Sequence, residues 1–149
     1  MNIEKHAYKW ARPLYKRDGK PLGVVWHNAA AVHCTEDAIH SWHLANGWSG
    51  IAYHFFVTKD GRVVQGRPEW ALGGHALGAS SWLGVCFEGN FEGPDKVMNK
   101  KQLAAGKWLH SYITKKYGPI RDRRHKDMPG NSTACPGRYF PFTAITGAR

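Results

Sequence analysis

Residues 22–47, LGVVWHNAAAVHCTEDAIHSWHLANG, predict a buried strand followed directly by a helix. The apolar run Leu22–Trp26 leads into His27, which is typical of a buried strand with a functional group at its end. For the helix, Thr35 is the predicted N-cap, and Asn46–Gly47 is predicted to end it. One apolar stripe follows the helical repeat: Ala38, Ile39, Trp42 and Ala45. This strand and helix favour an α/β fold.

Three more strands are expected further along the chain. AYHFFVT (52–58) and RVVQ (62–65) are rich in aromatic and β-branched residues, and the turn at Asp60–Gly61 between them predicts a hairpin. LGVCF (83–87) is another candidate for a buried strand. The Gly-rich segment Pro68–Ser81 is expected to be a surface loop.

A second helix is predicted to begin near Asn99, with Gln102 three residues on as in a capping box, and to end at Gly118–Pro119. The stretch from Met128 is rich in Pro and Gly and is expected to be irregular. Strands alternating with helices predict a mixed central β-sheet flanked by helices, in a single domain over residues 1–149. The apolar positions of this second helix are Ala105, Leu109, Tyr112 and Ile113.

The composition is that of a folded protein with one core. Of the 149 residues, 42% are hydrophobic and 21% are charged, which argues against an intrinsically disordered chain. No apolar run approaches the ~20 residues that span a bilayer, so no membrane insertion is expected. The first segment, MNIEKHAYKW, lacks the apolar stretch of a secretory signal, which predicts cytoplasmic synthesis without a signal peptide. Action outside the membrane would then require a separate release device.

The net charge indicates which partners the chain can bind, and the cysteine content indicates whether disulfides stabilise it. Lys and Arg outnumber Asp and Glu by 21 to 11, and the net charge of +10 favours a polyanion: nucleic acid, a membrane surface or an acidic cell wall. The basic residues are scattered apart from the run at 121–126, and no nucleic-acid motif is present, so no nucleic-acid partner is expected. The three cysteines form no Cys-x-x-Cys pair, and their odd number argues against a disulfide framework.

Two clusters of residues are candidates for a metal site. The segment RRHKDMPGNSTACPG (123–137) contains His125 and Cys135, and an imidazole and a thiolate are natural zinc ligands. A catalytic zinc site needs three protein ligands and an open fourth position, and His27 would complete the set. Spacing alone leaves a rival cluster open, in which two histidines share one helical face. Its members are His33, Cys34, His40 and His43.

Five segments match the blocks of one enzyme family in order. They are VVWHNAA, GWSGIAYHFFVTKDGRVVQGRP, GGHALG, LGVCFEGNF and RRHKDMPGNSTACPG. In these blocks the chain resembles the N-acetylmuramoyl-L-alanine amidase family, which includes phage amidases and animal peptidoglycan recognition proteins. The resemblance runs from about Val24 to Gly137, and several blocks in the same order are more specific than any one alone.

The resemblance implies which residues form the site. The family's zinc ligands correspond to His27, His125 and Cys135, so one Zn²⁺ per chain is expected and the rival cluster is assigned to a helix surface. Tyr53 matches the family's catalytic tyrosine near the metal. His75 matches a histidine that lines the substrate groove.

Three positions depart from parts of the family. Asn28 stands where many relatives have a second His after the ligand. Thr133 occupies a position that is Lys in some phage enzymes and Thr in zinc-binding recognition proteins, and it is expected to act as a second, neutral donor in catalysis. Cys86 stands where the muropeptide-recycling branch has a catalytic Glu, and it is expected to be a buried hydrophobe. These departures favour a tyrosine-based mechanism, with Glu88 as a minor candidate.

The resemblance implies zinc-dependent hydrolysis of the amide bond between N-acetylmuramic acid and L-alanine in bacterial peptidoglycan. Zinc that activates water and polarises a carbonyl suits this reaction. The favoured role is a phage or prophage lysis enzyme that reaches the wall after release, with peptidoglycan and anionic wall polymers as partners. The alternative is a recognition protein that binds peptidoglycan without cutting it. Relatives of that kind tend to have lost the Cys ligand, which this chain retains at Cys135.

Overall fold

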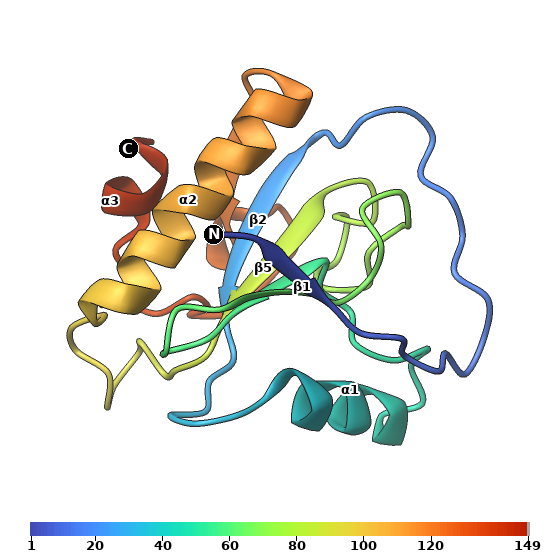
Figure 1. Cartoon of the computed structure of the whole chain (residues 1–149), viewed down its shortest axis with the longest axis horizontal. Helices are drawn as coiled ribbons and strands as arrows, with labels where there is room; N and C mark the ends of the chain where they lie inside the picture. The colour runs from blue at the N-terminus through green and yellow to red at the C-terminus, as the bar shows by residue number, and fades with distance from the viewer. Residues whose placement is uncertain (149) are drawn as a thin grey trace.

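One mixed β-sheet organises residues 1–148, the part of the chain that the computed structural model describes (Figure 1). Its six strands have the order β1-β4-β3-β5-β2-β6, and every neighbouring pair is parallel except β3 and β4. This confirms the predicted mixed sheet flanked by helices. Among these residues, no helix has both the length and the apolar character to cross a bilayer. The elements are β1 (Ile3–Lys5), β2 (Gly23–Asn28), α1 (Glu36–Ala45), β3 (Phe55–Val57), β4 (Val63–Gln65), β5 (Leu83–Phe87), α2 (Lys100–Tyr117), β6 (Arg121–Arg124), the 3₁₀ helix η1 (His125–Asp127) and α3 (Phe142–Thr146).

Helices cover both faces of the sheet, which explains why the central strands β2 and β5 are buried along their whole length. In Figure 1, α2 and α3 lie on one side of the sheet and α1 lies on the other. Val24 and Trp26 belong to the core that α2 and α3 cover. Successive side chains of a strand alternate, so His27 points to the α1 side. Its register partner Cys86 packs there with Ile39 of α1.

α1 has the predicted ends but not the predicted buried face. The side chain of Thr35 accepts a hydrogen bond from the N–H of Ala38, which confirms it as the N-cap. The predicted apolar stripe is wrong, because Trp42 is exposed while Ile39 and His40 are buried. The buried face therefore includes a histidine, which hydrophobic periodicity alone does not reveal.

α2 begins and ends as predicted. Asn99 caps it by accepting a hydrogen bond from the N–H of Gln102 at 2.9 Å, and Gly118 follows the last turn with a φ of 81°. The second half of the capping box is absent, because the Gln102 side chain donates instead to the carbonyls of Val57 and Glu88. Gln102 thereby ties α2 to the ends of β3 and β5.

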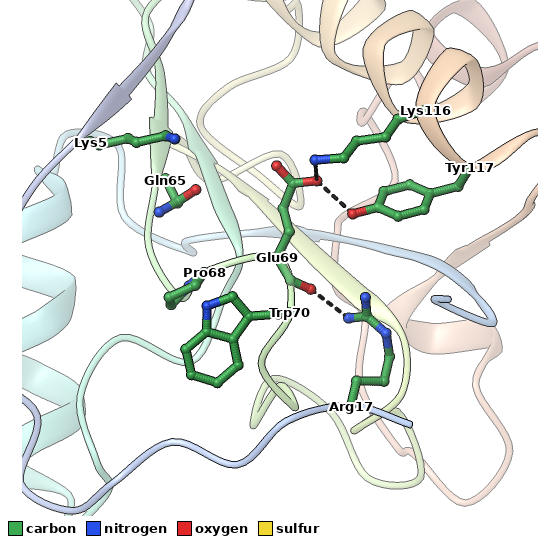
Figure 2. A pocket seen from close by; sticks show the side chains of 8 residues that line it. All are labelled: Lys5, Arg17, Gln65, Pro68, Glu69, Trp70, Lys116 and Tyr117. Atoms are coloured by element: carbon green, nitrogen blue, oxygen red, sulfur yellow. Dashed lines mark hydrogen bonds and ion pairs between the residues drawn. The ribbon is translucent and has the colours of Figure 1, made fainter. Parts of the chain in front are cut away.

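The last turn of α2 holds the loop that follows β4 (Figure 2). The carboxylate of Glu69 accepts hydrogen bonds from the hydroxyls of Tyr112 and Tyr117, at 2.8 and 2.7 Å. It also pairs with the ammonium of Lys116 at 3.0 Å. Residues 68–81 form a loop, as predicted, and this network fixes the start of that loop.

Four elements have no counterpart in the sequence predictions: β1, β6, η1 and α3. β6 has the sequence RDRR and lies at the edge of the sheet, so its polar side chains carry no strand pattern. α3 falls in the segment predicted to be irregular, where Phe142 and Ile145 are buried in the core shared with α2. The hairpin is confirmed, with strands shorter than predicted. Short elements of this kind depend on tertiary contacts rather than on local sequence.

Candidate metal centre

Two parallel strands bring the predicted histidine ligands together. Trp26 of β2 pairs with Arg124 of β6, so the residues that follow, His27 and His125, are neighbours with ring centroids 4.7 Å apart. Cys135 comes from the loop after η1, and its Sγ lies 3.8 Å from Nδ1 of His27. One possible ligand atom from each of these three residues lies within 4.8 Å of the other two. In residues 1–148 no other group of three His, Cys, Asp or Glu side chains converges in this way.

The chemistry of this donor set fits a zinc ion. His27 is 1% exposed, and its burial, together with His75 and His125, holds its pKa well below the usual range. The ring is therefore neutral, which is the form that binds a metal. Burial raises the pKa of the Cys135 thiol, while the N–H of Asn28, 3.3 Å from Sγ, favours the thiolate. Two imidazoles and one cysteine sulfur are the donor types of a catalytic zinc site, which takes three protein ligands and leaves the fourth position to water.

His75 lies directly behind His27 and is 8% exposed. Its Nε2 is 3.0 Å from the carbonyl oxygen of Trp82, and its Nδ1 is 2.9 Å from Nε2 of His27. A carbonyl only accepts, so His75 carries its hydrogen on Nε2, and its Nδ1 accepts a hydrogen bond from His27. The free lone pair of His27 is then on Nδ1, the atom that faces the Cys135 sulfur. Sequence reasoning predicts a substrate contact for His75, whereas here both of its ring nitrogens are engaged inside the protein.

Asn131 orients His125 by a hydrogen bond to Nε2, as His75 does for His27. Its Oδ1 is 2.9 Å from Nε2 of His125. The amide is fixed by Leu77, which accepts a hydrogen bond from Nδ2 at 2.9 Å and donates its N–H to Oδ1 at 3.2 Å. His125 therefore donates from Nε2 and keeps the lone pair of Nδ1 free. Sequence reasoning missed Asn131, because nothing in the local pattern links it to Leu77.

Tyr53 lies between His27 and α1. Its ring centroid is 5.0 Å from that of His27 and 5.5 Å from that of His43. Burial, and then the nearby thiols of Cys86 and Cys135, raise the pKa of its hydroxyl well above the usual range. The phenol therefore keeps its proton at neutral pH and can donate it.

Thr133 is exposed and shapes the loop that carries the sulfur. Its Oγ1 accepts a hydrogen bond from the N–H of Cys135 at 3.2 Å. The hydroxyl hydrogen is then free to donate to another group. The structure places Thr133 beside Cys135, one of the three predicted ligands, and its role in catalysis stays a prediction.

The rival cluster forms no metal site in residues 1–148, and its assignment to a helix surface is wrong for His40. His40 is 9% exposed, and its Nδ1 accepts a hydrogen bond from the N–H of Ile51 at 2.9 Å. Nδ1 of His43 accepts one from the N–H of Ala52 at 3.0 Å. These two rings of α1 brace the segment that leads into Tyr53.

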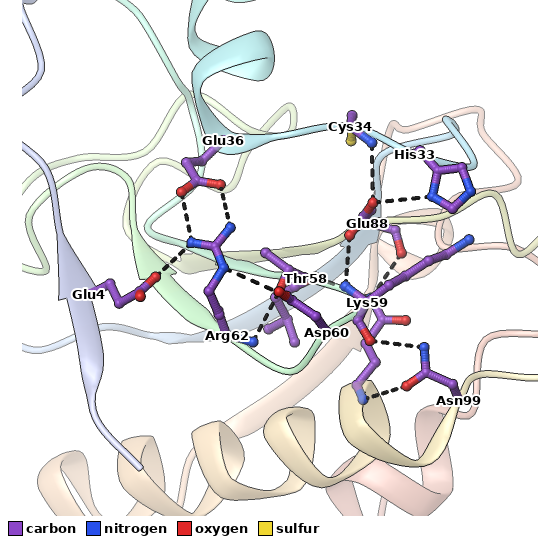
Figure 3. Close-up of polar contacts among 12 residues, drawn as sticks. Glu4, His33, Cys34, Glu36, Thr58, Lys59, Asp60, Arg62, Glu88 and Asn99 are labelled. Carbon is purple, nitrogen blue, oxygen red and sulfur yellow. Dashed lines mark hydrogen bonds and ion pairs between the residues drawn. The ribbon is translucent and has the colours of Figure 1, made fainter.

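Glu88, the minor catalytic candidate, ties two loops together (Figure 3). Its Oε1 accepts a hydrogen bond from the N–H of Lys59 at 2.7 Å, and its Oε2 accepts one from the N–H of Cys34 at 3.3 Å. The same Oε2 lies 3.6 Å from Nδ1 of His33. These contacts indicate a structural carboxylate. Cys86 is fully buried, as predicted.

Comparison with known proteins gives a family-model match, similar sequences and a similar solved structure. Residues 17–138 match the sequence model of a family described as N-acetylmuramoyl-L-alanine amidase. The endolysin of Escherichia phage T7 is 31% identical over 123 residues, which cover 73% of this chain and 80% of that protein. Peptidoglycan recognition protein 4 of Mus musculus is 36% identical over 116 residues, 76% of this chain and 30% of that protein. The solved structure of N-acetylmuramoyl-L-alanine amidase LysC from Clostridium intestinale has a TM-score of 0.90 at 36% identity, covering 99% of this chain and 96% of that one.

Proposed function

Because the chain belongs to the N-acetylmuramoyl-L-alanine amidase family, we propose that it holds one Zn²⁺ as the cofactor of its amidase reaction, bound by His27, His125 and Cys135. The reaction is hydrolysis of the amide bond between N-acetylmuramic acid and L-alanine in peptidoglycan. The observation that carries the zinc assignment is the convergence of two imidazoles and one thiol within 4.8 Å.

The side chains around the proposed ligands orient the two imidazole rings and donate hydrogen bonds or protons to the reacting amide. Zinc bound here would acidify a water molecule and polarise the amide carbonyl. His75 and Asn131 act as positioning residues, because they hold both imidazoles in the tautomer that offers Nδ1. Tyr53 keeps its proton and lies against His27, so its hydroxyl can donate to the developing oxyanion or to the leaving amine. Thr133 adds a second, neutral donor.

We assign the chain to bacterial lysis by a phage or prophage, because its relatives include the endolysin of phage T7. Cytoplasmic synthesis followed by release to the wall belongs to this proposal. Peptidoglycan is then the main partner, and the net charge of +10 suits anionic wall polymers as additional partners.

The similarity to a peptidoglycan recognition protein keeps a binding-only function as the second candidate. The ligand set argues for cutting, because a protein that only binds the wall has no need of a metal site with an open position. Turnover on purified cell wall distinguishes the two functions.

Elemental analysis of the purified protein tests the zinc assignment. We expect one zinc ion per chain, loss of turnover when a chelator removes the metal, and recovery when zinc is restored. An active preparation that contains no metal would overturn the assignment.

A further inference from the structure

Figure 2 shows a cavity of about 560 Å³. It lies on the α2 side of the sheet, whereas His27 points to the α1 side. Lys5 of β1 and Gln65 of β4 are register partners, and both contribute to it. Val64 packs on the α1 side of the sheet, so its neighbour Gln65 points to the α2 side. None of the lining residues belongs to the metal site. They are Lys5, Arg17, Gln65, Pro68, Glu69, Trp70, Lys116 and Tyr117.

Arg17 is a nearly buried cation without a carboxylate partner in residues 1–148. It is 5% exposed, and its guanidinium donates only to backbone carbonyls, to Gly19 at 3.1 Å and to Glu69 at 2.6 Å. In Figure 2 its remaining terminal nitrogen turns toward the side of the cavity where Tyr117 lies. Carbonyls satisfy hydrogen bonds but leave the positive charge uncompensated, so the cavity favours an anion.

The single carboxylate in the cavity does not neutralise Arg17. Burial raises the pKa of Glu69, but the hydrogen bonds from Tyr117 and Tyr112 and the contact with Lys116 outweigh it and lower the pKa overall. Glu69 is therefore ionised, and its carboxylate is engaged by Tyr112, Tyr117 and Lys116 rather than by Arg17. Three cations, Lys5, Arg17 and Lys116, face this one carboxylate, which leaves two positive charges.

Trp70 adds an apolar surface at the same place. It is 50% exposed, and its indole lines the cavity beside Pro68. Carbon-bound hydrogens of a sugar or polyol can pack on such a ring while an attached anion reaches the cations. The cavity has room for more than a bare phosphate ion.

We propose that this cavity binds a phosphate group of an anionic wall polymer, a chain of sugar or polyol units joined by phosphodiesters. The phosphate oxygens accept hydrogen bonds from Arg17, Lys5 at the other end of the cavity pairs with a further phosphate of the same chain, and the polyol between them packs on Trp70. The inference rests on the proposed wall substrate. Because the metal site is on the opposite face, the polymer can retain the protein on the wall while the metal site stays open to peptidoglycan.

Binding of soluble poly(glycerol phosphate) to the zinc-loaded protein tests this proposal. Lys5→Gln removes one exposed cation from the cavity without altering the backbone, and we expect about two- to five-fold weaker binding. Lys107→Gln is the matched control, since Lys107 is exposed on α2 and does not line the cavity. It should bind the polymer like the wild type. Trp70→Leu should also weaken binding.

Hydrolysis of a soluble muramyl peptide is measured in parallel, because it reports on the metal site alone. We expect Lys5→Gln and Lys107→Gln to hydrolyse it as the wild type does. Equal polymer binding by the two lysine variants would overturn the proposal, since net charge would then explain the affinity. A single-stranded oligonucleotide with the same number of phosphates is the second control. The proposal is overturned if this oligonucleotide binds as tightly as poly(glycerol phosphate) and if Lys5→Gln weakens its binding too. If the wild-type protein does not hydrolyse the muramyl peptide, the proposed function is refuted instead of the proposed polymer site.

Discussion

Replacing His75 by Ala removes the hydrogen bond that fixes the ring of His27. The bond spans 2.9 Å between rings that are 8% and 1% exposed, so bulk water cannot fully replace it. Its loss leaves the Nε2–H of His27 and the carbonyl of Trp82 without these partners, at a cost of about 1–3 kcal/mol for each buried group. Partners of this kind typically contribute about 10- to 100-fold to metal affinity, and we expect a zinc affinity lowered by that factor.

Competition with a zinc-binding dye measures the affinity, and thermal unfolding in excess chelator measures the stability of the metal-free protein. His40→Ala is the matched control, because His40 is also buried and uses both ring nitrogens, with Lys9 and Ile51. We expect this control to lose stability and to keep the wild-type zinc affinity. The reasoning is refuted if His75→Ala binds zinc like the wild type, or if both variants lose affinity equally.

Three further predictions concern catalysis, the metal and acid stability. Tyr53→Phe should fold and hold zinc, while single-turnover cleavage of a muramyl peptide falls by about 10²- to 10³-fold, because one transition-state donor is lost. Thr133→Ala should act in the same direction but more weakly, since water can replace its hydroxyl; unchanged rates in both variants would remove both residues from catalysis. Cys135→Ser should lower the zinc content sharply, because the soft thiolate is lost, and full zinc occupancy would contradict this. Burial raises the pKa of Glu36, but hydrogen bonds from Arg62 outweigh it and lower the pKa overall (Figure 3). The folded-state pKa is thus below the unfolded value of about 4.3, so Glu36 stabilises the protein above that pH and loses this effect as the pH falls through the folded-state pKa. Melting temperatures between about pH 2.5 and 6 should therefore fall less steeply for Glu36→Gln than for the wild type, and equal slopes would contradict the pKa shift.

Helices with a clear N-cap residue and strands with a continuous apolar run were predicted correctly from the sequence. α1 and α2 begin directly after the predicted N-caps Thr35 and Asn99, because each of these side chains accepts a hydrogen bond from the first turn of its helix. β5 was predicted as Leu83–Phe87 because this segment is an apolar run, and the structure explains the run, since helices cover both faces of the sheet and the strand is buried throughout. Edge strands such as β6 have no such requirement, and RDRR gave no signal.

Family resemblance predicted the proposed metal ligands, whereas the residues that orient their rings could be identified only from the fold. His75 and Trp82 lie on different segments from His27, and only the parallel pairing of β2 with β5 brings them together. The same holds for His40, whose partner is the backbone of Ile51. A pattern of residue types does not encode which backbone group a buried histidine will meet.

Mass spectrometry of digested cell wall decides which bond the protein cuts. With metal present, we expect free amino groups on the L-alanine of the stem peptide and no new reducing sugar ends, because the site is suited to a carbonyl. The same digest with chelator should show no cleavage, and added zinc should restore it. New reducing ends, or free L-alanine amino groups produced by metal-free protein, would contradict a zinc-dependent amidase built on His27, His125 and Cys135.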